Sequence, residues 1–278
     1  MPRQSRIDAP GALHHIIARG IGRRKIFDND GDRDDFLQRL GTAITETRTA
    51  CFAWALIPNR FHLLVRTGQT PVATVMRRLL TGYAIGYNRR HRRWGHLFQN
   101  RYKSILCQEE PYFLELVRYI HLNPLRAGLV KDLVSLDKYR YAGHSALMGN
   151  SENGFQDIDS VLKRFDRRAG TARKRYRTFV QTGIEMGRRP ELTGGGLIRS
   201  MGGWASVKAL RRAKAYMKGD ERILGGGDFV NEVLAQAQED YEQRYRLASM
   251  GLTVDDVAVR VAQLMQMPVE QIWLPGKR

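Results

Sequence analysis

The order of the sequence patterns predicts an α+β fold: one antiparallel sheet of the ferredoxin-like, split βαβ plan, with helices on one face. Three observations support it. Short apolar or alternating runs that suit strands are interrupted by two longer runs of helical spacing, in the order β-α-β-β-α-β. A turn signal, Pro58-Asn59, joins the second and third strand-like runs directly. About 130 residues suffice for this plan, so it fits the first half of the chain.

Each element has its own signal. The patterns predict strands at 13–20, 51–57, 61–67 and 94–107, and helices at 29–48, 70–93 and 109–129. Aspartates stand at the start of the first helix, where they suit the helix dipole. Thr70-Pro71 opens the second helix with an N-cap residue and a proline at the first helical position. Asn123-Pro124 should bring the third helix to an end.

The second half of the chain reads as an extension. The polar, glycine-containing segment 151–158 marks a boundary, so we expect one domain at 1–148 and a mainly helical, basic extension at 149–278. Helical patterns occupy 162–187 and roughly 228–273. The glycine-rich segment 188–204 between them has the composition of a linker.

The most informative bulk property is charge, since the 278 residues carry a net charge of +18. No Asp or Glu occurs from Thr47 to Gln108, and these 62 residues hold 11 basic ones: Arg48, Arg60, Arg66, Arg77, Arg78, Arg89, Arg90, Arg92, Arg93, Arg101 and Lys103. A solvated surface normally mixes both signs, so this segment predicts a polyanion as partner, and nucleic acid is the commonest one. A membrane is not expected, because no run approaches ~20 apolar residues and no basic amphipathic surface helix is evident.

Several classes of function lack their motifs. The chain has no Gly-x-x-x-x-Gly-Lys-Ser/Thr, no dinucleotide fingerprint and no Gly-x-Ser-x-Gly. Two cysteines, Cys51 and Cys107, cannot form a disulfide framework or a four-cysteine zinc site. Both lie in apolar, strand-like runs and are expected to be buried thiols, which predicts a cytoplasmic protein.

The segment ALIPNRFHLLVRTG (55–68) contains a candidate metal ligand, His62. Alternate side chains of a strand point to opposite faces, so Arg60 shares the face of His62. Two histidines at these positions could chelate one divalent ion, whereas an arginine is always protonated and has no acceptor. A single strand histidine is more often a surface or core residue than a ligand.

In YIHLN (119–123), Tyr119 and Asn123 share a helix face at i and i+4. A phenol beside a carboxamide can be an attacking hydroxyl next to a metal or phosphate ligand. The alternative is a tyrosine packed on the sheet and an asparagine that stops the helix before Pro124.

Two further segments suit nucleic acid. RGIGRRK (19–25) is a glycine-containing, basic loop after a strand, and NRRHRRWGHLFQNRYK (88–103) mixes cations with Trp94, Phe98 and Tyr102. Bases could stack on these rings, but Trp94 and Phe98 could equally belong to the core. The predicted DNA-contacting residues are Arg19, Arg23, Arg24, Lys25, Arg60, Arg77, Arg78, Arg89, Arg90, Arg92, Arg93, Arg101 and Lys103.

Four segments in order resemble the single-tyrosine HUH transposases, in particular the REP-associated tyrosine transposases. They are LHHIIARGIGRRKIF, WALIPNRFHLLVRTG, GHLFQNRYKSILC and LVRYIHLNPLRAGLV, and the resemblance covers about residues 10 to 145. It implies a ferredoxin-like domain that recognises hairpin-forming single-stranded DNA and cuts beside it during DNA transposition.

The resemblance also implies a chemistry. In that family a His-hydrophobic-His strand holds Mg²⁺ or Mn²⁺, and a helix tyrosine attacks the scissile phosphate to form a 5′-phosphotyrosine and a free 3′-hydroxyl. Carried over by position, the nucleophile is Tyr119, the surviving histidine is His62 and the third polar ligand is Asn123. Arg60 stands where the other histidine would be, so we expect retained DNA binding with reduced or absent cleavage.

Other readings stay open. The chain could be a non-catalytic, domesticated or decayed DNA-binding protein, or an RNA-binding module, although its central strands lack the closely spaced aromatics of such a module. TVDDVAVRVAQLMQMPVEQIW weakly resembles the opening of a DnaA-like helix-turn-helix, and PGKR follows before a recognition helix, so the module is either truncated or absent. We expect a monomer or homodimer that associates with the bacterial nucleoid.

Overall fold

The structure is a computed structural model that describes residues 7–187, 189, 192, 220–237 and 254–272. The chain divides into two compact units, Met1–Val230 and Asn231–Arg278. The first unit holds the sheet and therefore extends past the boundary predicted at residue 148. Among the described residues, no helix is both long and apolar enough to cross a bilayer.

The centre of the first unit is a sheet with strand order β2-β3-β1-β4-β5. Its first four strands are β1 (Leu13–Arg19), β2 (Ala50–Ile57), β3 (Arg60–Arg66) and β4 (Lys103–Cys107). Each of these strands is antiparallel to its neighbours. With α1 (Asp30–Thr47) between β1 and β2 and α2 (Val72–Arg90) between β3 and β4, this is the split βαβ plan. The predicted α+β fold class is confirmed.

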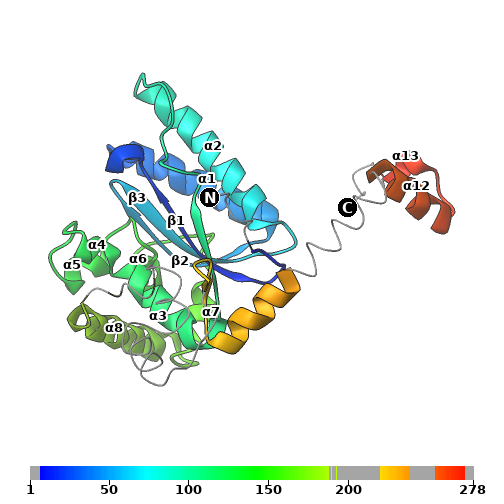
Figure 1. Ribbon diagram of the computed structural model, residues 1–278. Helices are drawn as coiled ribbons and strands as arrows, with labels where there is room; N and C mark the ends of the chain where they lie inside the picture. The colour runs from blue at the N-terminus through cyan, green and yellow to red at the C-terminus, as the bar shows by residue number, and fades with distance from the viewer. Residues whose placement is uncertain (1–6, 188, 190–191, 193–219, 238–253, 273–278) are drawn as a thin grey trace, which may run out of the picture. The chain divides into compact units, whose positions relative to one another are not determined.

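Helices cover both faces of the sheet (Figure 1). On one face, α1 and α2 pack through side chains such as Phe36 and Tyr83 against Leu63 of β3. This is the helix layer that the sequence predicts. On the opposite face, α3 (Glu109–His121) packs through Leu116 and Ile120, and α8 (Ala169–Glu185) joins the same core. The second layer arises because the central strands carry apolar side chains on both faces of the sheet, and each face has to be covered.

Short helices follow α3 and complete this second layer. They are α4 (Asn123–Arg126), α5 (Leu133–Asp137), α6 (Gly143–Met148) and α7 (Ile158–Leu162). Asn123-Pro124 does end α3, and Pro124 then lies in the first turn of α4. Because α8 contributes Tyr176 and Val180 to the core under the sheet, part of the predicted extension belongs to the first unit.

The fourth strand is shorter than the predicted range 94–107. Residues 94–102 form a loop, with a single bridge between Phe98 and Gly20, and β4 begins only at Lys103. Arg92 (φ 48°) and Gly95 (φ 83°) have left-handed backbone conformations, which turn the chain and prevent extended pairing there.

A fifth strand closes the outer edge of β4. Strand β5 (Ile223–Leu224) runs parallel to β4, with Leu106 opposite Ile223 and Cys107 opposite Leu224. The second unit contains α12 (Val254–Leu264) and α13 (Val269–Ile272), which agree with the helical pattern predicted there. The predicted linker 188–204, apart from two residues, and the terminal PGKR lie outside the described residues.

Candidate functional site

The site begins with the pairing of β1 and β3. In this ladder His62 lies opposite Ile17 and Arg60 lies opposite Arg19. Directly opposed residues of antiparallel strands share a face, and so do residues two apart. Arg60 and His62 therefore share one face, as the sequence predicts, and Arg19 and Ile17 share it with them.

Tyr119 lies against this face. It is half-buried on α3, and its ring centroid is 6.0 Å from that of His62 in an edge-on arrangement. The structure thus brings together the two residues that the family resemblance nominates as nucleophile and metal ligand. Whether they have these roles stays a prediction.

The same contact includes a histidine that the sequence reasoning missed. His15 of β1 lies with its Nε2 atom 3.1 Å from Nδ1 of His62, and its ring centroid is 5.9 Å from that of Tyr119. The one available signal was the pair His14-His15, whose members must point to opposite faces of a strand. The register of β1 against β3 decides which of them meets His62, and one sequence does not reveal that register.

The environment of His62 favours the neutral imidazole. The residue is 3% exposed, and its pKa lies well below the usual value because of burial first, and then because of the nearby His15, Arg60 and Arg19. Its Nε2 atom is buried and has no hydrogen-bond partner among the residues that the structure describes. A neutral imidazole can accept a proton or bind a metal ion.

Three guanidinium groups surround the phenol and the imidazoles. Arg60 is half-buried, and burial together with Arg19 lowers its pKa, while Tyr119 opposes that shift. Arg126 of α4 lies over the Tyr119 ring, with its guanidinium carbon 5.4 Å from the ring centroid. The result is a group of positive charges beside a phenol, which suits an anion such as a phosphodiester.

Asn123 has a local role in the structure. Its Nδ2 atom donates a hydrogen bond to the Tyr119 carbonyl oxygen at 3.1 Å, and the residue is buried. This contact stabilises the end of α3 one turn after Tyr119. Its predicted role as a metal ligand stays a prediction.

The predicted DNA-contacting cations lie mostly at the surface, and only Arg60 and Arg93 are half-buried. Two of them are ion-paired: Arg78 with Glu46, and Arg90 with both Asp32 and Asp35. These acidic residues come from α1, so the fold neutralises part of a segment that contains no acid itself. The remaining arginines of the set form no ion pair with the acidic residues that the structure describes.

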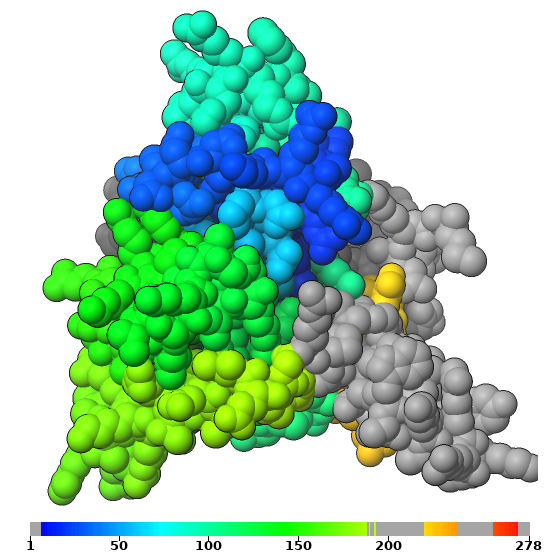
Figure 2. Space-filling view, turned by 90° about the vertical axis from the view of Figure 1, so that its left-hand side faces the viewer, coloured from blue at the N-terminus to red at the C-terminus, as the bar shows by residue number. Residues whose placement is uncertain are grey.

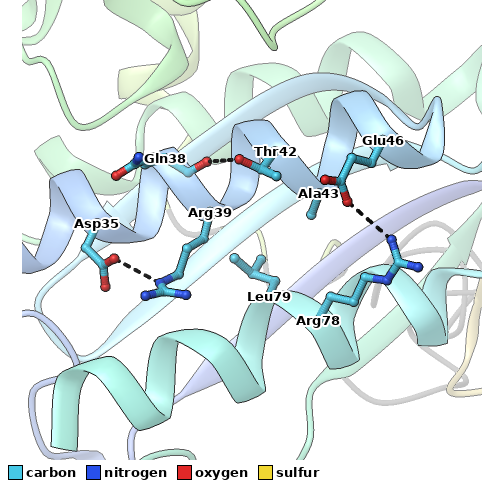
Figure 3. A pocket seen from close by; sticks show the side chains of 8 residues that line it. All are labelled: Asp35, Gln38, Arg39, Thr42, Ala43, Glu46, Arg78 and Leu79. Atoms are coloured by element: carbon cyan, nitrogen blue, oxygen red, sulfur yellow. Dashed lines mark hydrogen bonds and ion pairs between the residues drawn. The ribbon is translucent and has the colours of Figure 1, made fainter. Parts of the chain in front are cut away.

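A surface pocket of about 340 Å³ lies between α1 and α2 in part of this region, and Figure 3 shows the residues that line it. The ion pairs Arg39–Asp35 and Arg78–Glu46 bound it. Because α1 and α2 cover the face of the sheet opposite to α3, this pocket is separated from Tyr119 by the sheet. We assign it no role in the chemistry.

Asp28, Asp32 and His91 form a second cluster of groups that can bind metals, with ligand atoms within 4.8 Å of one another. The structure gives these groups other partners. His91 Nε2 lies 2.9 Å from both carboxylate oxygens of Asp32, Arg90 pairs with the same carboxylate, and Tyr87 donates to Asp28. The cluster therefore fastens the end of α2 to the start of α1.

Comparison with known proteins gives a likeness among solved structures. No family model matches the chain, and no curated protein matches it. Among solved structures, the chain is similar to a REP-associated tyrosine transposase bound to a REP hairpin. The two share 15% sequence identity with a TM-score of 0.45, over 57% of this chain and 90% of the other.

Proposed function

We propose that this chain binds single-stranded, hairpin-forming DNA and holds one phosphodiester against Tyr119. Cleavage and rejoining then proceed through a 5′-phosphotyrosine, at a lower rate than in a site with two histidines on β3. The observation that carries the proposal is the contact of the Tyr119 ring with two histidine rings on a sheet face that also bears Arg60 and Arg19. The order of the four segments that resemble HUH transposases supports the same reading.

The transfer step needs a nucleophile, a base and positive charge. The Tyr119 hydroxyl oxygen forms a bond to phosphorus. The bond between phosphorus and the 3′-oxygen breaks, and the electron pair leaves with that oxygen, which then takes up a proton to become the 3′-hydroxyl. While no ion is bound, the neutral His62 of the imidazole pair can accept the phenolic proton; when an ion occupies the imidazole nitrogens, the proton passes to solvent water instead. The 3′-hydroxyl can later attack the phosphotyrosine, and rejoining needs no external energy because the phosphoester is conserved.

Arg60 and Arg19 would hold the phosphate. They lie opposite each other at the end of the β1–β3 ladder, on the face of His62. A guanidinium can bind two phosphate oxygens at once and stabilise charge that develops during the transfer. It stabilises that charge less than a divalent ion does, which is why we propose slow cleavage.

His15 and His62 are the residues that would hold Mg²⁺ or Mn²⁺. Imidazole nitrogens that bind one divalent ion at about 2.1 Å lie about 3.0–3.4 Å apart at octahedral or tetrahedral angles. The nitrogens of His15 and His62 are 3.1 Å apart, which fits this range once both are unprotonated and the ion replaces the hydrogen bond between them. When bound, such an ion would polarise the phosphate. Arg60 and Arg19 repel a free cation, so we propose that the ion binds only when a DNA phosphate is present.

A covalent-adduct assay tests the proposal. The protein is mixed with hairpin-bearing single-stranded DNA and Mg²⁺ or Mn²⁺, and the products are separated on a denaturing gel. A shifted band that disappears in Tyr119→Phe supports strand transfer. Arg60→His is measured alongside, and a faster rate in this variant supports the proposed loss of activity through Arg60. Binding without an adduct in either chain would contradict the catalytic part of the proposal.

The second candidate is a non-catalytic DNA-binding protein. Arg60 favours this candidate, because an arginine at this position can bind a phosphate but cannot bind a metal ion as a histidine would. The same assay separates the two, since the second candidate binds the hairpin and forms no adduct. An RNA-binding module is the third candidate. Competition between DNA and RNA hairpins of equal sequence at one salt concentration tests it.

A further inference from the structure

The loop that follows α2 exposes a tryptophan among cations. Trp94 is 86% exposed, the largest exposed fraction of any large apolar side chain among the described residues. Large aromatic rings are usually buried for the most part, so this exposure calls for a reason. Arg92 and Arg93 directly precede Trp94, and the whole segment 47–108 lacks acidic residues.

The backbone of this loop is held by specific contacts. Arg92 and Gly95 adopt left-handed conformations on either side of Trp94. Asn88 donates from Nδ2 to the Gly95 carbonyl oxygen at 2.9 Å, and its own carbonyl accepts from the Arg93 amide at 2.8 Å. Trp94 is thus presented on an ordered turn, so little backbone entropy is lost when a ligand packs on its ring.

The other aromatic residues of this segment do not share its exposure. Tyr102 is buried, and Phe98 is half-buried against the core of α1 and α2. The sequence left open whether the aromatic residues of this segment stack on bases or belong to the core, and the answer differs from residue to residue. Phe98 and Tyr102 belong to the core, and Trp94 faces solvent.

The loop is joined to the end of β1. The Ile21 amide donates to the Leu97 carbonyl oxygen at 3.0 Å, and the Gln99 amide donates to the Arg19 carbonyl oxygen at 2.8 Å. Figure 2 shows the end of α2 and its loop (cyan) beside the N-terminal segment (blue). Since Arg19 lies opposite Arg60, the basic turn 20–25 and the Trp94 loop continue the surface that we propose for phosphate binding.

We propose that Trp94 is a stacking platform for an unpaired base of the bound DNA, with Arg92 and Arg93 on the flanking phosphates. The inference rests on the DNA binding proposed above and adds a contact that distinguishes unpaired from paired strands. An indole ring can stack on any base because every base has a π face, but a base inside a duplex has both faces covered. The predicted contact is therefore tolerant of sequence and sensitive to pairing.

The test compares ligands that have equal charge and differ in their bases. Oligo-dT and an abasic deoxyribose-phosphate oligomer of the same length carry the same phosphates, but only oligo-dT can stack. Affinities of the full chain, Trp94→Ala and Trp94→Phe are measured by fluorescence anisotropy at several salt concentrations. Val134→Ala, which changes an exposed apolar residue of α5, is the matched control. Circular dichroism checks that each variant is folded.

We expect Trp94→Ala to bind oligo-dT about 5- to 100-fold more weakly, with the slope of log K against log salt unchanged, because stacking releases no counterions. Trp94→Phe should recover most of the loss, and the abasic oligomer should bind all four proteins alike. Equal affinity of Trp94→Ala and the unaltered chain for oligo-dT would overturn this inference and leave the proposed function intact. No binding of the unaltered chain to oligo-dT or to a hairpin would instead contradict the proposed function.

Oligo-rU of the same length identifies the nucleic acid. A loss with oligo-dT at least as large as with oligo-rU supports DNA as the ligand. A loss confined to oligo-rU would overturn the assignment to DNA and favour the RNA-binding candidate.

Discussion

His15 and His62 hydrogen-bond to each other from neighbouring antiparallel strands, with Nε2 of the first 3.1 Å from Nδ1 of the second. Both residues are buried, and their ring centroids lie 5.9 Å and 6.0 Å from the ring centroid of Tyr119. The strand β3 alone offers a single imidazole at this site, because Arg60 occupies the position two residues before His62. The neighbouring strand supplies the second imidazole from the same face of the sheet.

This pair predicts a specific effect of His15 on metal binding. His15→Gln should weaken the binding of Mn²⁺ to the protein–DNA complex by about tenfold or more, since one of two nitrogen ligands is lost. The measurement is the electron paramagnetic resonance signal of free Mn²⁺ during titration, with an uncleavable hairpin DNA present. His14→Gln changes the adjacent histidine, which faces the other side of β1 and lies 3.1 Å from Asp8. Equal Mn²⁺ affinity in both variants would argue against His15 as a ligand.

Arg60 is predicted to hold a phosphate rather than to fill space. Arg60→Ala should weaken DNA binding at low salt and reduce the magnitude of the salt slope by about 0.7 to 0.9, the share of one phosphate contact. Affinities for a hairpin DNA between low and moderate salt measure this slope. Arg66→Ala is a useful comparison, because Arg66 lies on the same strand and pairs with Glu109. A slope that stays unchanged in Arg60→Ala would show that Arg60 contacts no phosphate.

Two adjacent arginines of α2 should behave differently. Arg89 is exposed and forms no ion pair with the described acidic residues, whereas Arg90 pairs with Asp32 and Asp35. Arg89→Ala should therefore lower DNA affinity with little effect on the free energy of unfolding. Arg90→Ala should lower the free energy of unfolding by about 1–3 kcal/mol, because the buried Asp32 carboxylate loses a charged partner. Urea unfolding and DNA titration of both variants check this, and the reverse pattern would refute it.

Stability should fall in mild acid because of buried histidines. Burial lowers the pKa of His62 and of His121 well below the usual 6.5. Below about pH 6.5 the unfolded chain therefore binds protons that the folded chain does not. The free energy of unfolding is fully present above this pH and decreases below it, by up to ~1.4 kcal/mol per pH unit for each such histidine.

Urea unfolding at pH 7.5, 6.0 and 5.0 measures this decrease, in a range above the ordinary pKa of carboxylates. His62→Gln should reduce the dependence on pH by the share of one histidine. A free energy of unfolding that is constant from pH 7.5 to 5.0 would mean that these histidines take up protons as readily in the folded protein as in the unfolded chain.

Another prediction concerns a buried hydroxyl. Tyr176 Oη lies 2.7 Å from His121 Nδ1 and 2.8 Å from His144 Nδ1, and His144 Nε2 lies 2.9 Å from Asp137. Tyr176→Phe keeps the ring and removes the group shared by both imidazoles. We expect a loss of about 1–3 kcal/mol in the free energy of unfolding, measured in urea, because buried nitrogens are left without partners. A change under 0.5 kcal/mol would indicate that water replaces the hydroxyl.

Local rules predicted part of this molecule. The period of two along a strand places Arg60 and His62 on one face, and the order of patterns gives the four-stranded plan. The contact between Tyr119 and His62 was expected only through the family resemblance, because helix packing is not encoded in local spacing. His15 was missed because its meeting with His62 depends on strand register. The pairing of Arg78 and Arg90 with acids of α1 was missed because it depends on how two helices pack.

Strand β5 covers the outer edge of β4 with residues from the C-terminal half of the chain. The Leu106 and Gln108 amides donate to the carbonyl oxygens of Arg222 and Leu224, at 2.7 Å in each case. A protein cut after residue 148 would leave these amides unpaired on an open strand edge, and it would also uncover the apolar surface of α3 on which α8 packs. Open edges pair with other chains. We therefore expect a protein truncated at residue 148 to self-associate, because residues far along the chain cover this edge.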